Sequence, residues 1–145
     1  MVLQRWQSVF LLIAAMAMVA YLCMPVMTLM NESGVVSVNA LGCGENGVAN
    51  YLLLTLDALI AILALVTIFK YRQLKFQQRL CHVIVLLLVA LLASVTVLAL
   101  MQRGHAIAVV SYSVLLPFAA LFFTIWAGKR IKADRKLLSD SERLR

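Results

Sequence analysis

Residues 83–101 read VIVLLLVALLASVTVLALM, a stretch of 19 residues without a charged side chain. The hydrocarbon core of a bilayer is ~30 Å thick, so a helix that rises ~1.5 Å per residue needs about 20 apolar residues to cross it. The stretch lacks the alternation of apolar and polar residues that marks a lipid-facing barrel strand, and its apolar run from Leu86 to Leu92 is typical of a helix. It therefore predicts a transmembrane helix.

Three further apolar stretches of similar length flank this one. They cover residues 9–29, 51–69 and 106–127, which contain 21, 19 and 22 residues. Across the chain 64% of the residues are hydrophobic and 13% are charged, which leaves too little polar surface for a soluble domain. We therefore predict an all-α membrane protein, an antiparallel bundle of four transmembrane helices within residues 1–128, followed by a basic cytoplasmic tail at residues 129–145.

The first apolar stretch has two interpretations. Arg5 precedes it and small residues such as Ala15 lie within it, as in a cleavable signal peptide. However, its 21 apolar residues exceed the usual signal-peptide core, and no small-x-small cleavage site follows them. The pattern favours a retained helix.

The basic residues indicate the orientation. Of the thirteen lysines and arginines, twelve lie before the first stretch, between the second and third, or after the fourth, and Arg103 is the exception. Cytoplasmic segments of membrane proteins are enriched in Lys and Arg. We therefore expect a multi-pass protein of the bacterial inner membrane with both termini in the cytoplasm, and with residues 30–50 and 102–105 outside.

The outer segment 31–50 carries a weak β signal. Val35 to Val38 is flanked by glycines, a pattern that favours short β structure such as a small hairpin across the mouth of the bundle. Cys43 lies in this segment and Cys23 near the outer end of the first stretch, whereas Cys81 is on the opposite side. A disulfide between Cys23 and Cys43 is left open.

Asp57 is the only Asp, Glu, Lys or Arg within the four stretches. A charge at the centre of a membrane helix costs ~2.5 to 3.5 kcal/mol, and Asp57 lies about 9 Å beyond Tyr51 along the helix. Other polar residues at a similar depth predict an intramembrane polar layer with Asp57: Ser94, Thr96, Ser111 and Tyr112, together with Tyr21, Cys23 and Ser113. The layer is either a proton or ion relay or a set of hydrogen bonds that fixes the helix order, and the second interpretation is favoured because no second charged partner is evident.

The segment after the fourth stretch is the candidate interaction surface. Its basic residues are Lys129, Arg130, Lys132, Arg135, Lys136, Arg143 and Arg145. Ser139 to Glu142 resembles a capping box that would start a new short helix, and Pro117 predicts a kink in the fourth span. The expected partners are anionic lipid headgroups at the cytoplasmic face and a membrane protein or a second copy of the chain, and nucleic acid is not expected.

The sequence offers no set of catalytic or metal-binding residues. His82 and His105 lie at opposite faces of the predicted bundle, so they form no cluster with each other. We expect no enzyme activity, no metal and no cofactor. The function we predict is that of an accessory or complex-associated membrane protein, and the alternative is a small transporter or channel component that uses Asp57.

The segments that flank the helices resemble a known family. They are Gln4-Arg5-Trp6-Gln7-Ser8, Phe69-Lys70-Tyr71-Arg72, Gln77-Gln78-Arg79-Leu80-Cys81, Leu116-Pro117, Ile131-Lys132-Ala133-Asp134 and Ser141-Glu142-Arg143-Leu144-Arg145. Together they are similar to the Bacteroidetes four-helix membrane family called domain of unknown function 4293. The resemblance covers the whole chain and implies a four-span inner-membrane protein, and it brings no activity, substrate or cofactor.

Overall fold

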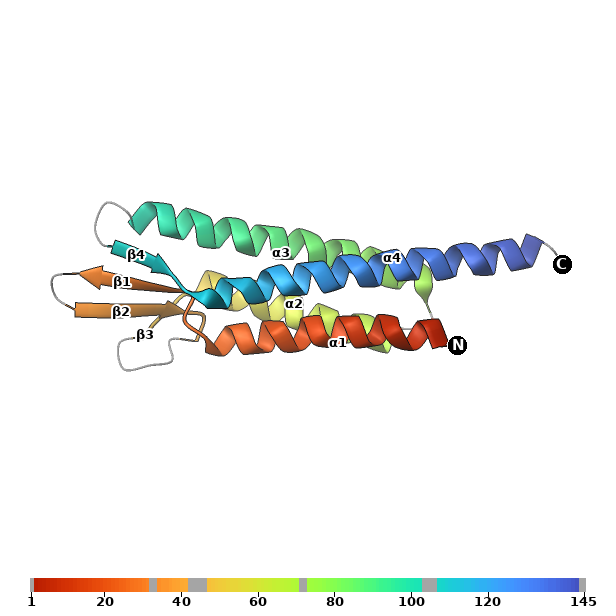
Figure 1. Cartoon of the computed structure of the whole chain (residues 1–145), viewed down its shortest axis with the longest axis horizontal. Helices are drawn as coiled ribbons and strands as arrows, with labels where there is room; N and C mark the ends of the chain where they lie inside the picture. The colour runs from red at the N-terminus through yellow and green to blue at the C-terminus, as the bar shows by residue number, and fades with distance from the viewer. Residues whose placement is uncertain (1, 32–33, 42–46, 71–72, 103–106, 144–145) are drawn as a thin grey trace.

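The computed structural model describes residues 2–31, 34–41, 47–70, 73–102 and 107–143 (Figure 1). Within these residues four helices dominate: α1 (Val2–Cys23), α2 (Tyr51–Phe69), α3 (Leu74–Gln102) and α4 (Leu115–Arg143). The connections contain the strands β1 (Met27–Asn31), β2 (Gly34–Asn39), β3 (Gly47–Ala49) and β4 (Ile107–Val110), and the short 3-10 helix η1 (Tyr112–Val114). Each of these four helices is long and apolar enough to cross a membrane, as the four apolar stretches of the sequence predicted.

Helices that follow one another in the sequence run in opposite directions (Figure 1). The main helix contacts are α1 with α2, α2 with α3, α3 with α4, and α4 with α1, so the four helices form a closed ring. Both termini lie at one end of the bundle, which we call the basic end: the start of α1, the α2–α3 connection and the end of α4. The strands lie at the opposite end, which we call the sheet end.

The first helix is shorter at its C-terminus than predicted. The prediction of one helix over residues 9–29 is wrong, because α1 ends at Cys23 and Met27 already belongs to β1. Pro25 explains the break, since proline has no backbone N–H and disfavours helical geometry at the residue before it. Immediately after Pro25, the N–H of Val26 donates to the carbonyl of Val38 at 2.8 Å, which starts strand pairing.

The fourth apolar stretch also divides into a strand and a helix. The prediction of a helix over residues 106–127 is wrong at its start, because residues 107–110 form β4 and α4 begins only at Leu115. Pro117 therefore lies in the first turn of α4 rather than in its interior. The N–H groups of a first turn have no partner within the helix, so proline is tolerated there, and the kink predicted at Pro117 does not arise.

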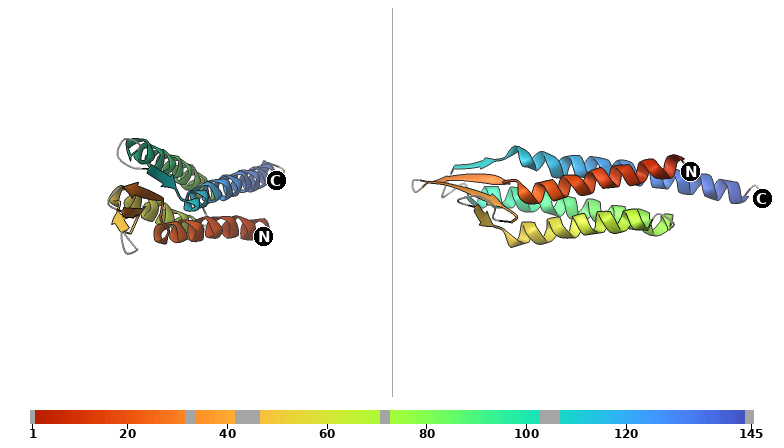
Figure 2. Two further views of the ribbon diagram at one scale, coloured as in Figure 1. Left: turned by 60° about the vertical axis from the view of Figure 1, so that its left-hand side comes forward. Right: turned by 90° about the horizontal axis from the view of Figure 1, so that it is seen from below.

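The basic tail is not a separate element. From Lys129 to Arg143 it continues α4 without a break, so the new helix predicted to start at Ser139 is wrong. Neither glycine nor proline occurs between these two residues, and the segment is rich in Lys, Arg, Leu and Ala, which favour helix. At ~1.5 Å per residue this part of α4 is about 22 Å long. Its C-terminal end extends past the other three helices at the basic end (Figures 1 and 2).

The strands form one sheet in the order β3-β2-β1-β4. β1 and β2 are an antiparallel hairpin that ends at the pair Asn31 and Gly34, and β4 pairs antiparallel with the other edge of β1. Gly34 has a φ of +134°, which side chains other than that of glycine rarely allow. The short β structure predicted in the segment 31–50 is thus present, but the sheet also takes strands from residues 27–31 and 107–110, and it projects along the bundle axis (Figure 2).

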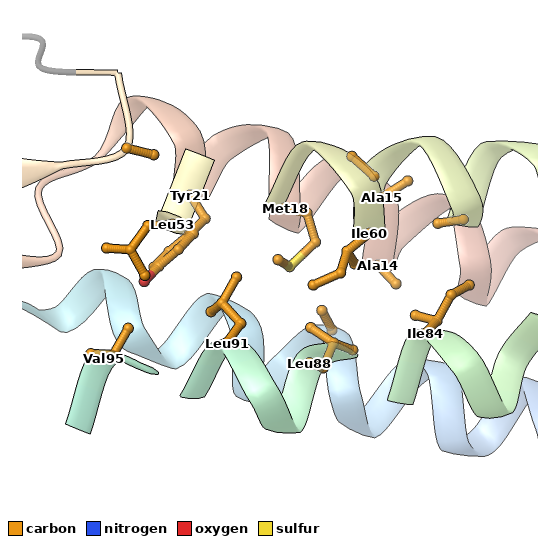
Figure 3. Packing of buried hydrophobic residues seen from close by; sticks show 14 of the residues in the cluster. Ala14, Ala15, Met18, Tyr21, Leu53, Ile60, Ile84, Leu88, Leu91 and Val95 are labelled. Atoms are coloured by element: carbon orange, nitrogen blue, oxygen red, sulfur yellow. The ribbon is translucent and has the colours of Figure 1, made fainter. Parts of the chain in front are cut away.

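The core runs along the inside of the bundle. Met18 of α1, Ile60 of α2 and Leu88 of α3 point into the space between the helices (Figure 3). Buried residues recur on α2 every three or four positions: Leu53, Asp57, Ile60, Ala61, Ala64 and Thr67. Alanine is frequent in the core. Small side chains allow the helix backbones to approach closely and to pack by van der Waals contact.

Candidate functional sites

Asp57 lies on the inward face of α2, one turn from Leu53 on one side and from Ile60 and Ala61 on the other. Its exposed fraction is 0%, and neither carboxyl oxygen has a hydrogen-bond partner among the described residues. Tyr21 of α1 is buried to the same extent, and its hydroxyl also lacks a partner there. Asp57 and Tyr21 are therefore two buried polar side chains on the packed helices α1 and α2, in the sheet-end half of the bundle, and we call them the buried pair.

The other members of the predicted polar layer make different contacts. The hydroxyl of Ser94 donates to the carbonyl of Leu91, and that of Thr96 to the carbonyl of Ala93, each at 2.7 Å and within α3. Because these hydroxyl protons are used within one helix, they are not donated to Asp57. Thr96 is also exposed on the outside of the bundle.

The layer residues that precede α4 lie at the sheet end. Ser111 is half-buried and its N–H donates to the carbonyl of Val26 at 3.0 Å, which links this segment to β1. Tyr112 is 92% exposed, so it lies outside the buried pair. The Ser113 hydroxyl donates to the carbonyl of Pro25. Cys23 is exposed, and Cys43 lies outside the described residues, so their disulfide stays a prediction.

A second buried polar group lies at the basic end and was missed by the sequence analysis. Gln7 of α1 and Gln77 of α3 are each 1% exposed. Gln7 Nε2 donates to Asp134 Oδ2, which ties the start of α1 to α4. The only signal in the sequence is spacing, because Gln7 precedes buried Leu11, and Gln77 precedes buried Cys81, by one helical turn.

The exposed basic residues of α4 surround this end. Lys129, Arg130, Lys132, Arg135 and Lys136 are all exposed. Arg135 Nη1 donates to Gln78 Oε1 of α3 at 3.0 Å, so one of the cations is held across the α3–α4 contact. The side chains of Arg143 and Arg145 are not among those described. In the described part of the chain, no group of three or more His, Cys, Asp or Glu could hold a metal ion.

Over the residues that the structure describes, the fold defines a class: a ring of four long apolar helices with a small sheet at one end and basic residues at the other. The chain belongs to the family described as domain of unknown function 4293 (DUF4293), whose model matches residues 3–144. This match confirms the resemblance found in the flanking segments. No curated protein and no solved structure matches the chain.

Proposed function

We propose that this chain is an accessory protein of the bacterial inner membrane, with both termini in the cytoplasm, that acts without catalysis by docking the projecting part of α4 onto an acidic partner in a membrane complex. The observation that carries the proposal is the continuous helix from Lys129 to Arg143, whose C-terminal end extends beyond the bundle and whose described cations are exposed. A second copy of the chain is the other partner to be distinguished by experiment.

The side chains on the outside of the bundle support placement in a membrane. Large apolar residues are exposed along all four helices, among them Met16, Ile62, Leu86 and Phe118, at 54% to 67% of their surface. Water-soluble monomers rarely expose continuous apolar surface of this extent. Lipid chains would cover it.

Aromatic residues support the same placement at both ends of the helices. Trp6 and Trp126 are about half exposed near the basic end, where each lies within 6.4 Å of the Phe10 ring. Tyr51 and Tyr112 are exposed at the sheet end. Trp and Tyr concentrate where a membrane meets water. From Tyr112 to Trp126 the chain rises about 20 Å, about 10 Å less than the ~30 Å hydrocarbon core, so the two groups flank most of the core rather than its full thickness.

The projecting helix offers two kinds of contact to a protein partner. Lys136 supplies an exposed positive charge. Leu137 and Leu138 are 61% and 55% exposed, although they lie beyond the apolar part of α4. Charge would steer an acidic partner to this helix, and the leucines would provide apolar contact area.

The proposal is tested by crosslinking in cells, with a photo-activated amino acid in place of exposed Ser139. We expect one discrete crosslinked species containing a second protein. The double variant Lys136→Glu, Leu137→Ser should reduce its yield at least about tenfold, because a charge is reversed and an apolar contact is lost. The control Arg79→Glu makes the same charge reversal at an exposed residue of α3 that does not line the grooves beside α4, and it should leave the yield within about twofold.

Two outcomes would contradict the proposal. One is the absence of any species heavier than the free chain while the protein is present at normal abundance. The other is an equal loss of yield in the double variant and in Arg79→Glu, which would show general attraction to the basic end rather than docking on α4. A crosslinked species that contains only this chain would assign the surface to a homo-oligomer.

A second function has an observation of its own in its favour. Asp57 and Tyr21 are fully buried on two helices that pack together, and both are unpartnered among the described residues; a carboxyl group in such surroundings suits the carriage of a proton or cation across a membrane. A small transporter or channel component that uses Asp57 is therefore the alternative. Substitutions at Asp57 separate the two functions, as argued in the Discussion.

A further inference from the structure

A groove runs between α3 and α4 near the basic end, with a volume of about 250 Å³. Its apolar part is lined by Val85 of α3 and by Ile125 and Gly128 of α4. Small residues form its deepest part: a Cβ at Gly128 would lie 3.8 Å from Cys81 Cβ, and Cys81 is only 2% exposed. The glycine therefore leaves open a strip between the helices that a larger side chain would fill.

The polar part of the groove lies toward the basic end. It is lined by Gln78 and His82 of α3 and by Lys129 and Lys132 of α4. His82 Nδ1 donates to the carbonyl of Gln78 at 2.7 Å, since that carbonyl can only accept. Beyond this point the groove continues past Arg135 and Lys136.

The charged residues that line the groove are all positive. Four cations line the groove and its continuation, and none of the described lining residues is an Asp or Glu. The nearest carboxyl group in the sequence, Asp134, accepts a hydrogen bond from Gln7 of α1. Arg130 lies between Lys129 and Lys132 in the sequence but does not line the groove.

We propose that this groove binds one anionic phospholipid, with the phosphate at Lys129 and Lys132 and an acyl chain along Val85, Ile125 and Gly128. Along the groove the apolar residues come first and the cations follow toward the basic end. A phospholipid has the same arrangement, with apolar acyl chains followed by a charged phosphate. Pockets that enclose a drug-sized ligand measure ~300–1,000 Å³, so this groove holds the headgroup and leaves most of the chains outside, along the apolar surface of α3 and α4.

The inference rests on the proposed placement of the four helices in a membrane, but it does not depend on the docking of α4 to a protein. The two tests change different side chains. The lipid test changes Lys129 and Lys132, whereas the docking test changes Lys136 and Leu137, of which Lys136 lines only the continuation of the groove and Leu137 lines neither part. Each proposal can therefore fail without the other.

The test is native mass spectrometry of the purified full chain in mild detergent. Phosphatidylglycerol and phosphatidylcholine with identical chains are titrated separately, and inorganic phosphate is added as a competitor. We expect one preferred phosphatidylglycerol per chain, bound on the order of tenfold more tightly than phosphatidylcholine, and no displacement by equimolar phosphate. Each Lys near an anionic lipid contributes ~1 kcal/mol, so Lys129→Gln with Lys132→Gln should weaken phosphatidylglycerol binding at least about tenfold.

Two matched controls make the result specific. Arg130→Gln with Lys75→Gln also removes two exposed cations at the basic end but leaves the groove unchanged, and it should keep binding within about twofold. Val85→Trp should fill the apolar part and weaken binding, whereas Val83→Trp, at an exposed residue of α3 that does not line the groove, should not. Unchanged elution volume and thermal midpoint identify the variants that remain folded.

Three results would overturn the proposal. The first is equal weakening of phosphatidylglycerol binding by Lys129→Gln with Lys132→Gln and by Arg130→Gln with Lys75→Gln. The others are equal affinity for the two lipids and complete displacement of phosphatidylglycerol by inorganic phosphate. In cells, Lys129→Gln with Lys132→Gln should leave the Ser139 crosslink in place. Loss of the lipid with retention of the crosslink would separate this site from the docking surface, and loss of the crosslink with retention of the lipid would remove the docking proposal alone.

Discussion

Asp57→Leu is expected to raise the stability of the protein, although the substituted residue is a buried acid. The described structure shows no hydrogen bond to either carboxyl oxygen. A buried polar group without a partner costs about 1–3 kcal/mol, and leucine has the same branching at Cγ without a polar atom. We therefore expect the free energy of unfolding, measured in mixed detergent and SDS micelles, to increase by about 1–3 kcal/mol.

Asp57→Asn is the matched variant, because it keeps the shape and a polar end while it removes the charge. If Asp57 joins helices by hydrogen bonds, as the sequence analysis favoured, Asn should be tolerated and Leu should lower the free energy of unfolding. A fall with Leu would therefore contradict the unpartnered carboxyl that the structure shows. If Asp57 instead carries a proton or ion, both variants should lose the phenotype of the wild-type gene while the protein stays at normal abundance.

Ala64→Phe is expected to have a large effect of the opposite sign. Ala64 is 1% exposed in a core that also includes Ala14, Ala15, Ala61 and Ala120. A phenyl ring at this position has to push the helices apart, and overpacking of a tight core costs about 1–3 kcal/mol or more. The thermal midpoint of the purified protein, followed by circular dichroism, should fall by several degrees, or the chain should not accumulate.

The control for this prediction is Ile62→Phe. It places the same ring on the same helix, but at a residue whose side chain is 60% exposed on the outside of the bundle. We expect the midpoint to change little there. Equal effects of the two substitutions would show that the inward face of α2 is not where the structure places it.

The long apolar helices could be predicted from the sequence because length and composition decide them. The stretch 51–69 coincides with α2, and 83–101 lies within α3. Residues 27–29 and 107–110 were assigned to helices because apolar residues suit a strand as well as a helix. What decides them is Pro25 and the pairing of β1 with β4, which are about 80 residues apart in the chain.

Part of the candidate sites could also be predicted from the sequence, and part could not. Asp57 was found because a carboxyl group within an apolar run is visible in one sequence. Depth in the membrane does not give the face of a helix, so Thr96 and Tyr112 were placed with Asp57 although the structure exposes them. Gln7 and Gln77 lie in the polar segments that flank the apolar stretches, and their burial follows from the packing of α1, α3 and α4 at the basic end.

The α3–α4 groove could not be predicted from the sequence. Its lining comes from two helices whose relative rotation sets which side chains share a surface. Lys129, Arg130 and Lys132 were predicted together as part of one basic tail. The packing of α4 on α3 places Lys129 and Lys132 in the groove and leaves Arg130 outside it. Gly128 gave no signal, because its role depends on the neighbouring Cys81.

The central claim is a four-span protein whose basic end faces the cytoplasm, and cysteine labelling in intact spheroplasts tests it most directly. Cys23, Cys43 and Cys81 are first replaced by alanine, and a single cysteine is then introduced either at exposed Val35 of β2 or at exposed Gln73 between α2 and α3. We predict that a membrane-impermeant maleimide labels position 35 in intact spheroplasts and position 73 only after the membrane is permeabilised. Labelling of position 73 with protection of position 35 would contradict the orientation, and labelling of both would contradict a bundle that spans the membrane.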